Sequence, residues 1–159
     1  GIAKGYIAGR AVEALKGEGV ERGILHAGGD MVVFQKKGLR QRTFKIGIQH
    51  PREQRLLGEV YLENGAVSTS GDYERYFVKD GDRYNHILDP STGVPADGCR
   101  SVTIIAEVPT IADALSTAVF VLGPEKGMAL IESLDKVEGV IVDSNGKVTT
   151  SKGFKGNIF

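Results

Sequence analysis

Short apolar segments separated by glycine-containing turns are the feature that most restricts how this chain can fold. Glycine accounts for 22 of the 159 residues, about twice the usual ~7%. The glycines stand singly or in pairs between apolar segments, as tight turns require and as a linker would not show. Asn64-Gly65, Asp80-Gly81 and Asn145-Gly146 are dipeptides typical of two-residue hairpins. We therefore predict antiparallel strands joined mainly by hairpins.

The apolar pattern between these turns predicts the individual elements. Apolar residues at helical spacing predict helices over 5–17, 110–122 and 125–134. Because the strands form hairpins and do not alternate regularly with helices, we expect an α+β fold with about three helices in a single domain, 1–159. Strands are predicted over 24–26, 31–35, 44–49, 57–62, 66–70, 75–78, 84–88, 101–106, 137–142 and 147–150.

Charge and cysteine content exclude several classes of protein. The chain has 20 basic and 20 acidic residues, so it lacks the basic excess of nucleic-acid binders and we expect no nucleic-acid partner. A lone Cys99 excludes an internal disulfide framework and a cysteine zinc cluster. No apolar run approaches the ~18 residues of a membrane span. A first residue Gly1, with neither an initiator Met nor a signal peptide after it, suggests a processed or truncated product.

Polar residues are densest over 68–95, which we predict to form a hairpin and its flanks. Thr69, Ser70 and Gly71 end an apolar strand, and small hydroxyl residues beside glycine offer hydroxyls and backbone N–H groups that suit a phosphate. The Asp-Pro-Ser-Thr-Gly run at 89–93 fits a ligand site or an ordinary turn. His86, on a predicted strand, is either a structural hydrogen-bonding residue or a general base.

Asp113 and Thr117 lie four residues apart on a predicted helix, which places both side chains on one face. Their neighbours are small or apolar, so the carboxylate needs a partner. A hard cation such as Mg²⁺ is one partner, because it binds carboxylate, hydroxyl and carbonyl oxygens. The alternative is that Asp113 caps a neighbouring backbone segment and Thr117 bonds within its own helix. The spacing leaves both open.

Two weaker signals lie near the start of the chain. Lys4 stands at a helix start, where an anion would be favoured, although a single lysine is more often a surface residue. Asp30 follows Gly28-Gly29, which is either a plain hairpin turn or a place where backbone approaches a ligand.

Taken in order, six motifs resemble the FAD:protein FMN transferase family, also known as ApbE and as thiamine-biosynthesis lipoproteins. The resemblance extends over almost the whole chain and corresponds to roughly the C-terminal half of a typical member. The motifs are Gly-Ile-Ala-Lys-Gly-Tyr at 1–6, Ala-Gly-Gly-Asp at 27–30, Lys-Ile-Gly-Ile at 45–48 before Pro51, Thr-Ser-Gly-Asp-Tyr-Glu-Arg at 69–75, His-Ile-Leu-Asp-Pro-Ser-Thr-Gly at 86–93 and Ala-Asp-Ala-Leu-Ser-Thr at 112–117.

The resemblance implies an α+β architecture similar to tunnelling-fold proteins and a Mg²⁺-dependent cleavage of the FAD pyrophosphate. FMN would pass to a Thr or Ser hydroxyl of an acceptor protein, a subunit of a membrane redox complex, and AMP would leave. Some members hydrolyse FAD to FMN and AMP instead. An FAD pyrophosphatase and a non-catalytic, truncated flavin-binding fragment therefore remain alternatives.

The resemblance also assigns roles to single residues. The metal would be held by Asp113, Thr117 and the carbonyl of Gly1, with Asp113 counted as catalytic. His86 would lie near the reacting phosphate as the catalytic base. The nucleotide would lie near Lys4, Asp30, Thr69, Ser70, Gly71 and His86.

Three further expectations come from the resemblance. Gly9 stands where many members have an acidic residue, so one polar contact to the ligand would be missing or moved. The N-terminal half of the family carries the lipoprotein signal and part of the flavin pocket, so we expect a missing N-terminal half or a homodimer to complete the site. The location would be the periplasm or the outer face of the cytoplasmic membrane.

Overall fold

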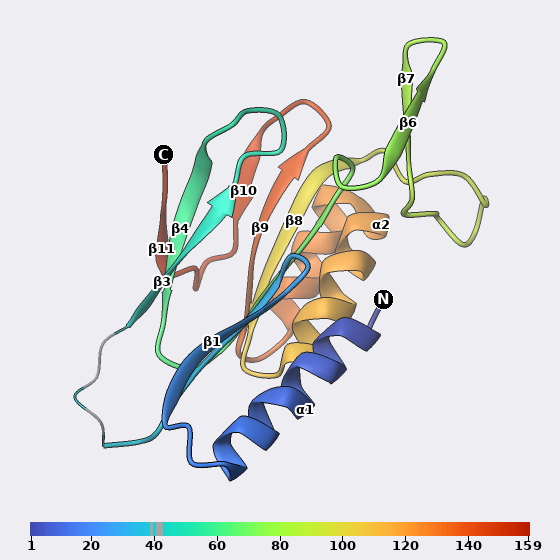
Figure 1. Cartoon of the computed structure of the whole chain (residues 1–159). Helices are drawn as coiled ribbons and strands as arrows, with labels where there is room; N and C mark the ends of the chain where they lie inside the picture. Colours follow the sequence, from blue (N-terminus) through green and yellow to red (C-terminus); the bar gives the residue numbers. More distant parts are fainter. Residues whose placement is uncertain (39, 41–42) are drawn as a thin grey trace.

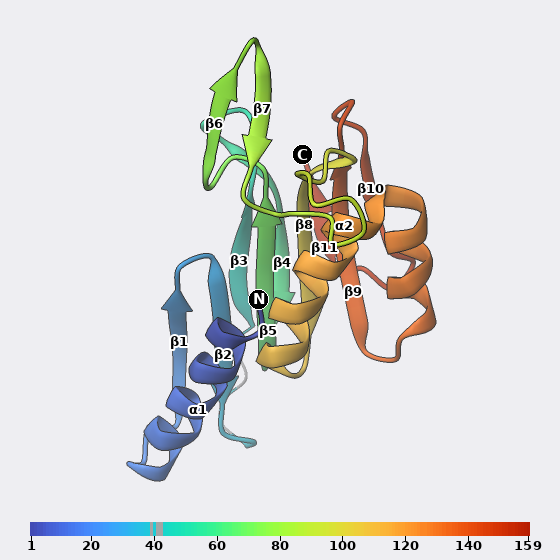
Figure 2. The same cartoon turned by 90° about the vertical axis from the view of Figure 1, so that its right-hand side faces the viewer.

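The computed structural model describes residues 1–38, 40 and 43–159. In this part of the chain, two helices, a six-stranded sheet and a three-stranded sheet form successive layers, and a two-stranded hairpin projects from one end (Figures 1 and 2). Every strand pair among the described residues is antiparallel. The expected α+β class is confirmed.

The helices are α1 (Ala3–Gly17) and α2 (Pro109–Ser133). The strands are β1 (Arg22–Ala27), β2 (Asp30–Gln35), β3 (Phe44–Gln49), β4 (Leu56–Leu62), β5 (Gly65–Gly71), β6 (Tyr76–Lys79), β7 (Asp82–Asn85), β8 (Cys99–Ala106), β9 (Val137–Asp143), β10 (Val148–Thr150) and β11 (Gly156–Ile158). The six-stranded sheet has the order β1-β2-β5-β8-β9-β10, and the three-stranded sheet has the order β11-β4-β3.

Two hydrophobic cores lie on opposite faces of the six-stranded sheet. On one face, α1 and α2 cover the sheet, and Phe120, Ile131 and Ile104 are fully buried between them. On the other face, the three-stranded sheet packs through Ile46 and Val60. Successive residues of a strand point to opposite faces, so the six-stranded sheet supplies side chains to both cores.

The helix count differs from the prediction because the predicted helices at 110–122 and 125–134 are the two arms of α2. They meet at Gly123, whose φ of 79° and ψ of 175° are not helical, and Pro124 follows it. A proline ring cannot continue the hydrogen bonding of the preceding turn, which explains the bend. The turn signal was therefore correctly located, and the two predicted helices are the arms on either side of the kink.

Helix α2 also differs from the expectation that no apolar run approaches a membrane span. Among the described helices it alone is long and apolar enough by composition, with a mean hydropathy of 1.3 in its most apolar 18-residue window. Some of its apolar residues fill the core beside β5, β8 and β9. Length and composition alone are weak evidence for a membrane span.

The turn signals were correct at three hairpins and wrong at one. The β1–β2, β6–β7 and β9–β10 pairs form as predicted. Asn64-Gly65, however, joins β4 to β5, which belong to different sheets. The Asn64 side chain accepts a hydrogen bond from the backbone of Gln35, so this turn carries the chain between layers. Strand β11, in a tail without a clear pattern, was not predicted.

Helix α1 lies directly against the start of α2. Gly5, Ala8 and Val12 are its buried residues, spaced three and four apart on one face. A Cβ atom at Gly5 would come within 2.4 Å of the Pro109 carbonyl oxygen and 2.7 Å of the Asp113 Cβ. Only glycine allows the two helices to approach this closely at that point.

We predict that Gly5→Ala lowers the free energy of unfolding by about 1–3 kcal/mol, because the added methyl meets backbone that cannot move aside. Gly9→Ala is the matched control. It lies on the same helix, and its Cβ would meet Pro109 side-chain atoms only at 3.7 Å or more, an ordinary contact. Gly9→Ala should be neutral or stabilising by up to about 1 kcal/mol. Urea unfolding of the two variants measures the difference, and equal stabilities would contradict this packing.

Candidate functional site

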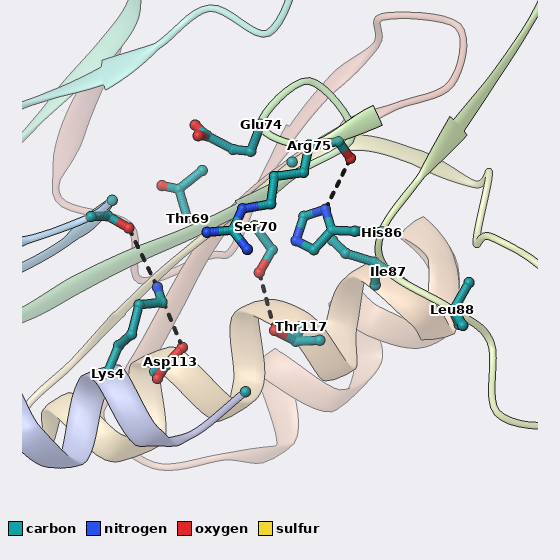
Figure 3. A pocket seen from close by; sticks show the side chains of 14 residues that line it. Lys4, Thr69, Ser70, Glu74, Arg75, His86, Ile87, Leu88, Asp113 and Thr117 are labelled. Carbon is teal, nitrogen blue, oxygen red and sulfur yellow. Dashed lines mark hydrogen bonds and ion pairs between the residues drawn. The ribbon is translucent and has the colours of Figure 1, made fainter. Parts of the chain in front are cut away.

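A cleft of about 590 Å³ opens at the N-terminal end of α1 (Figure 3). Four parts of the fold meet there: the start of α1, the β1–β2 turn, the end of β5, and the first half of α2. The segment after β7 closes a further side. The lining residues are Gly1, Lys4, Gly28, Gly29, Thr69, Ser70, Gly71, Glu74, Arg75, His86, Ile87, Leu88, Asp113 and Thr117.

All of the predicted site residues except Asp30 line this cleft. Asp30 is buried behind the cleft, where its carboxylate accepts hydrogen bonds from Lys4 Nζ at 2.8 Å and from Ser68 Oγ at 2.5 Å. The structure therefore brings together residues up to 116 positions apart in sequence, from Gly1 to Thr117. Asp30 does not line the cleft itself but pairs with Lys4, which does.

Asp113 connects the two helices at the base of the cleft. Its side chain is buried, and Oδ2 accepts a hydrogen bond from the backbone N–H of Gly5 at 2.8 Å. Gly5 belongs to the first turn of α1, where the N–H groups lack intrahelical partners and a negative charge is favoured. Neither this helix's N-cap residue, Ile2, nor its first turn supplies a carboxylate cap. The capping alternative considered for Asp113 is thus realised.

The second carboxylate oxygen of Asp113 remains accessible from the cleft. Oδ1 lies 3.9 Å from Lys4 Nζ, an ion pair beyond hydrogen-bond distance, and 3.6 Å from where a Cβ of Gly1 would stand. Lys4 Nζ also lies near the carbonyl oxygen of Gly28, at 3.4 Å. Capping α1 therefore occupies one oxygen of Asp113 and leaves the other facing Gly1.

The hydroxyl groups at the end of β5 point in two directions, as strand alternation requires. Ser70 faces α2, where its Oγ lies 3.2 Å from the Oγ1 of Thr117. Thr69 pairs instead with Thr103 on β8, with 2.9 Å between the hydroxyl oxygens. Thr117 therefore bonds across to the sheet, and not within its own helix as the alternative proposed.

His86 lies just beyond a strand, not on one, because β7 ends at Asn85. Its ring is exposed, and Nδ1 lies 3.2 Å from the backbone carbonyl oxygen of Arg75. A carbonyl only accepts, so this contact fixes the proton on Nδ1. In the neutral ring this leaves the lone pair on Nε2, which is the tautomer a general base needs.

Several lining residues were not singled out from the sequence. Glu74 and Arg75 belong to the 69–75 motif, and Ile87 and Leu88 follow His86 in the 86–93 motif. Their membership of these motifs was the sequence signal that could have identified them as site residues. Gly28 and Gly29 were predicted to form either a plain hairpin turn or a place where backbone approaches a ligand, and they both join β1 to β2 and line the cleft. Arg75 adds a second cation to Lys4, and two cations that line one cleft suit an anionic ligand.

One residue of the 69–75 motif has a structural contact instead. Asp72 is buried and forms a bidentate pair with Arg52, with N–O distances of 2.6 Å and 2.5 Å. The hydrogen bonds to Asp72 are the largest cause that raises the pKa of the Arg52 guanidinium above its usual value. This pair ties the end of β5 to the loop before β4.

The donor set of the cleft fits Mg²⁺ better than a transition metal. No cluster of three or more His, Cys, Asp or Glu side chains suited to a metal occurs in the described ranges 1–38, 40 and 43–159. At the base of the cleft, the oxygen donors of α2 and of the segment before α1 are the Oδ1 of Asp113, the hydroxyl of Thr117 and nearby backbone at Gly1. Mg²⁺ uses one or two carboxylates together with waters and substrate phosphates, whereas zinc requires three or four nitrogen, sulfur or carboxylate ligands.

Comparison with known proteins identifies relatives of this chain. A sequence model of the ApbE family matches residues 1–141. A FAD:protein FMN transferase of Klebsiella pneumoniae is 36% identical over 94% of this chain and 46% of its own length. A FAD:protein FMN transferase of Treponema pallidum is 36% identical over 96% of this chain and 45% of its own length. The chain thus spans about half the length of the curated relatives it matches.

Solved structures agree with the sequence comparison. The ApbE protein of Thermotoga maritima is 45% identical, with a TM-score of 0.86 over 95% of this chain and 50% of its own. The apo form of the flavinyl transferase ApbE from Pseudomonas stutzeri is 36% identical, with a TM-score of 0.74 over 95% of this chain and 48% of its own. With a family match over most of its length and the same fold, this chain belongs to the ApbE family.

Proposed function

We propose that this chain contributes the catalytic cleft of a flavin transferase that moves FMN from FAD to a Thr or Ser hydroxyl of an acceptor protein and releases AMP. One observation carries the proposal: His86, which follows β7, lines the same cleft as Asp113 and Thr117, which lie one turn apart on α2. The names of the relatives support flavin transfer as the reaction. Because the chain spans about half of their length, activity is to be tested in a chain of the relatives' full length.

Mg²⁺ is the proposed cation, held by Asp113 Oδ1, Thr117 Oγ1 and the carbonyl oxygen of Gly1. When bound, it would neutralise charge on the pyrophosphate, whose cleavage depends mainly on positioning and charge stabilisation. The accessible Oδ1 of this buried carboxylate supports the assignment, since a buried carboxylate is costly without close partners and Lys4 Nζ, at 3.9 Å, lies beyond hydrogen-bond distance. Lys4 and Arg75 would bind the phosphate oxygens.

In the proposed reaction, the acceptor hydroxyl oxygen forms a bond to the FMN phosphorus of FAD. The bond between that phosphorus and the bridging oxygen breaks, and the electron pair leaves with AMP. His86 Nε2 accepts the hydroxyl proton, while the Arg75 carbonyl holds Nδ1 and so the ring orientation. We further propose that the acceptor is a subunit of a membrane redox complex and that the reaction occurs outside the cytoplasmic membrane, as the family resemblance implies.

Hydrolysis of FAD is the second candidate. The His86 ring is exposed to solvent, so water can reach Nε2 as readily as a hydroxyl side chain can. Water would take the place of the acceptor oxygen and yield free FMN and AMP. Labelled FAD distinguishes the two reactions, because the flavin ends on the acceptor protein in one and in solution in the other.

We predict that Asp113→Asn weakens Mn²⁺ binding at least about tenfold and abolishes cation-dependent FAD cleavage, because it removes the negative charge. Asparagine retains a carbonyl oxygen for the Gly5 N–H, so the cap on α1 should survive, whereas Asp113→Ala would also remove the cap. Titration calorimetry with Mn²⁺ and an FAD assay measure the two effects. Asp143→Asn is the control, because Asp143 ends β9 and its side chain accepts hydrogen bonds from the backbone of the remote β9–β10 turn. Unchanged cation affinity in Asp113→Asn would overturn the cation site.

We predict that His86→Ala lowers the rate of FMN transfer by about 10²–10⁴-fold, the usual contribution of a general base. Mn²⁺ affinity should be unchanged, because His86 is not among the proposed ligands. Added imidazole should restore part of the rate, since the side chain faces an open cleft. Single-turnover rates with and without imidazole provide the measurement. A full transfer rate in His86→Ala would exclude this residue as the base.

A further inference from the structure

A series of hydrogen-bonded hydroxyl groups between β5 and α2 includes only one group, that of Thr117, with a part in the reaction proposed above. Ser116 Oγ lies 3.2 Å from Ser68 Oγ and 2.9 Å from Ser70 Oγ. Ser70 Oγ in turn lies 3.2 Å from Thr117 Oγ1, which lines the cleft. At its other end this series of hydroxyls reaches the carboxylate of Asp30 through Ser68. Ser68, Ser116 and Asp30 are all buried.

The direction of each hydrogen bond in this series follows from counting protons. A serine or threonine hydroxyl has a single proton, and an ionised carboxylate can only accept. Asp30 forms an ion pair with Lys4 at 2.8 Å, so its carboxylate is ionised. Ser68 must therefore donate its proton to Asp30 Oδ1 and can only accept from Ser116.

Ser116 determines which hydroxyl donates in the next hydrogen bond, the one to Ser70. Its hydroxyl lies 3.0 Å from the backbone carbonyl oxygen of Asp113, which can only accept. Its other buried neighbour, Ser68, is also restricted to accepting. The proton of Ser116 is thus committed to one of these two groups. In the remaining contact, at 2.9 Å, Ser70 must be the donor and Ser116 the acceptor.

The same count fixes Thr117. Ser70 has given its proton to Ser116, so in the contact between Ser70 and Thr117 the threonine donates. Thr117 Oγ1 then has no proton left to offer the cleft, only lone pairs. A hydroxyl oriented in this way can bind a cation, but it cannot donate a hydrogen bond to a phosphate oxygen.

We infer that Ser116 is a positioning residue that orients Ser70 and Thr117, so that Thr117 acts as a cation ligand and not as a phosphate donor. This inference rests on the proposed cation site and deepens it. It also gives Asp30 a different role from the expected nucleotide contact: Asp30 lies behind the cleft and anchors the far end of the hydroxyl series, with Lys4 as its counter-ion.

The test is the affinity of Ser116→Ala for Mn²⁺ alone, measured from the free Mn²⁺ signal in electron paramagnetic resonance. Without Ser116, the Ser70 proton is free to turn toward Thr117, whose own proton then points into the cleft. We expect the affinity to fall about three- to tenfold, the factor that one net hydrogen bond is worth. Ser70→Ala removes the acceptor for the Thr117 proton and should lower the affinity for Mn²⁺ by a similar factor. If Ser116→Ala does not fold, Ser70→Ala replaces it in the test.

The matched control is Thr103→Val. Thr103 lies on β8, and its hydroxyl pairs with that of Thr69 on β5, on the face of the sheet opposite to Ser68 and Ser70. The expected result is lower stability in urea with Mn²⁺ affinity within about twofold of wild type. A merely structural role for Ser116 predicts that affinity follows stability in both variants, and that result would overturn the inference.

The outcomes separate this inference from the proposed function. A wild-type protein that does not bind Mn²⁺ contradicts the cation site and the inference together. A wild-type protein that binds Mn²⁺, with Ser116→Ala and Ser70→Ala binding equally well, leaves the cation site standing and overturns the inference alone.

Discussion

One hydrogen bond, from the Gly5 backbone to the Asp113 carboxylate, joins residues 108 positions apart and holds the site together. It caps α1 with a side chain from α2, and glycine is required at this point because a Cβ would meet the Pro109 carbonyl. The same contact brings Gly1 and Lys4 beside the second oxygen of Asp113. Helix packing, helix capping and the geometry of the candidate cation site therefore depend on a single contact.

The six-stranded sheet supplies the other half of the site. Alternation along β5 turns Ser68 and Ser70 toward α2 and Thr69 toward Thr103. The hydroxyls facing α2 connect the buried Asp30 with Thr117 at the cleft, so the polar groups between helix and sheet are paired. Asp30, Ser68 and Ser116 are buried and do not line the cleft, so they order it from behind.

How far the sequence predicts this structure depends on how local each feature is. Asp80-Gly81 and Asn145-Gly146 form the predicted hairpins because turn chemistry is decided within a few residues. The prediction failed at Asn64-Gly65, because strand β4 finds its partners, β3 and β11, elsewhere in the chain. Spacing placed Asp113 and Thr117 on one helix face, but only the family resemblance grouped them with Lys4 and His86. The burial of Asp30 depends on Ser68, across the β2–β5 pair, and no local pattern indicates it.

The central claim is that a hard divalent cation binds between α1 and α2, beside Asp113 and Thr117. Paramagnetic broadening of backbone amide signals by substoichiometric Mn²⁺ would locate the cation directly in the folded chain. We expect the signals of Gly5, Asp113 and Thr117 to broaden first, while those of the β9–β10 hairpin remain sharp. Broadening centred on another part of the surface, or none near Asp113, would contradict the account.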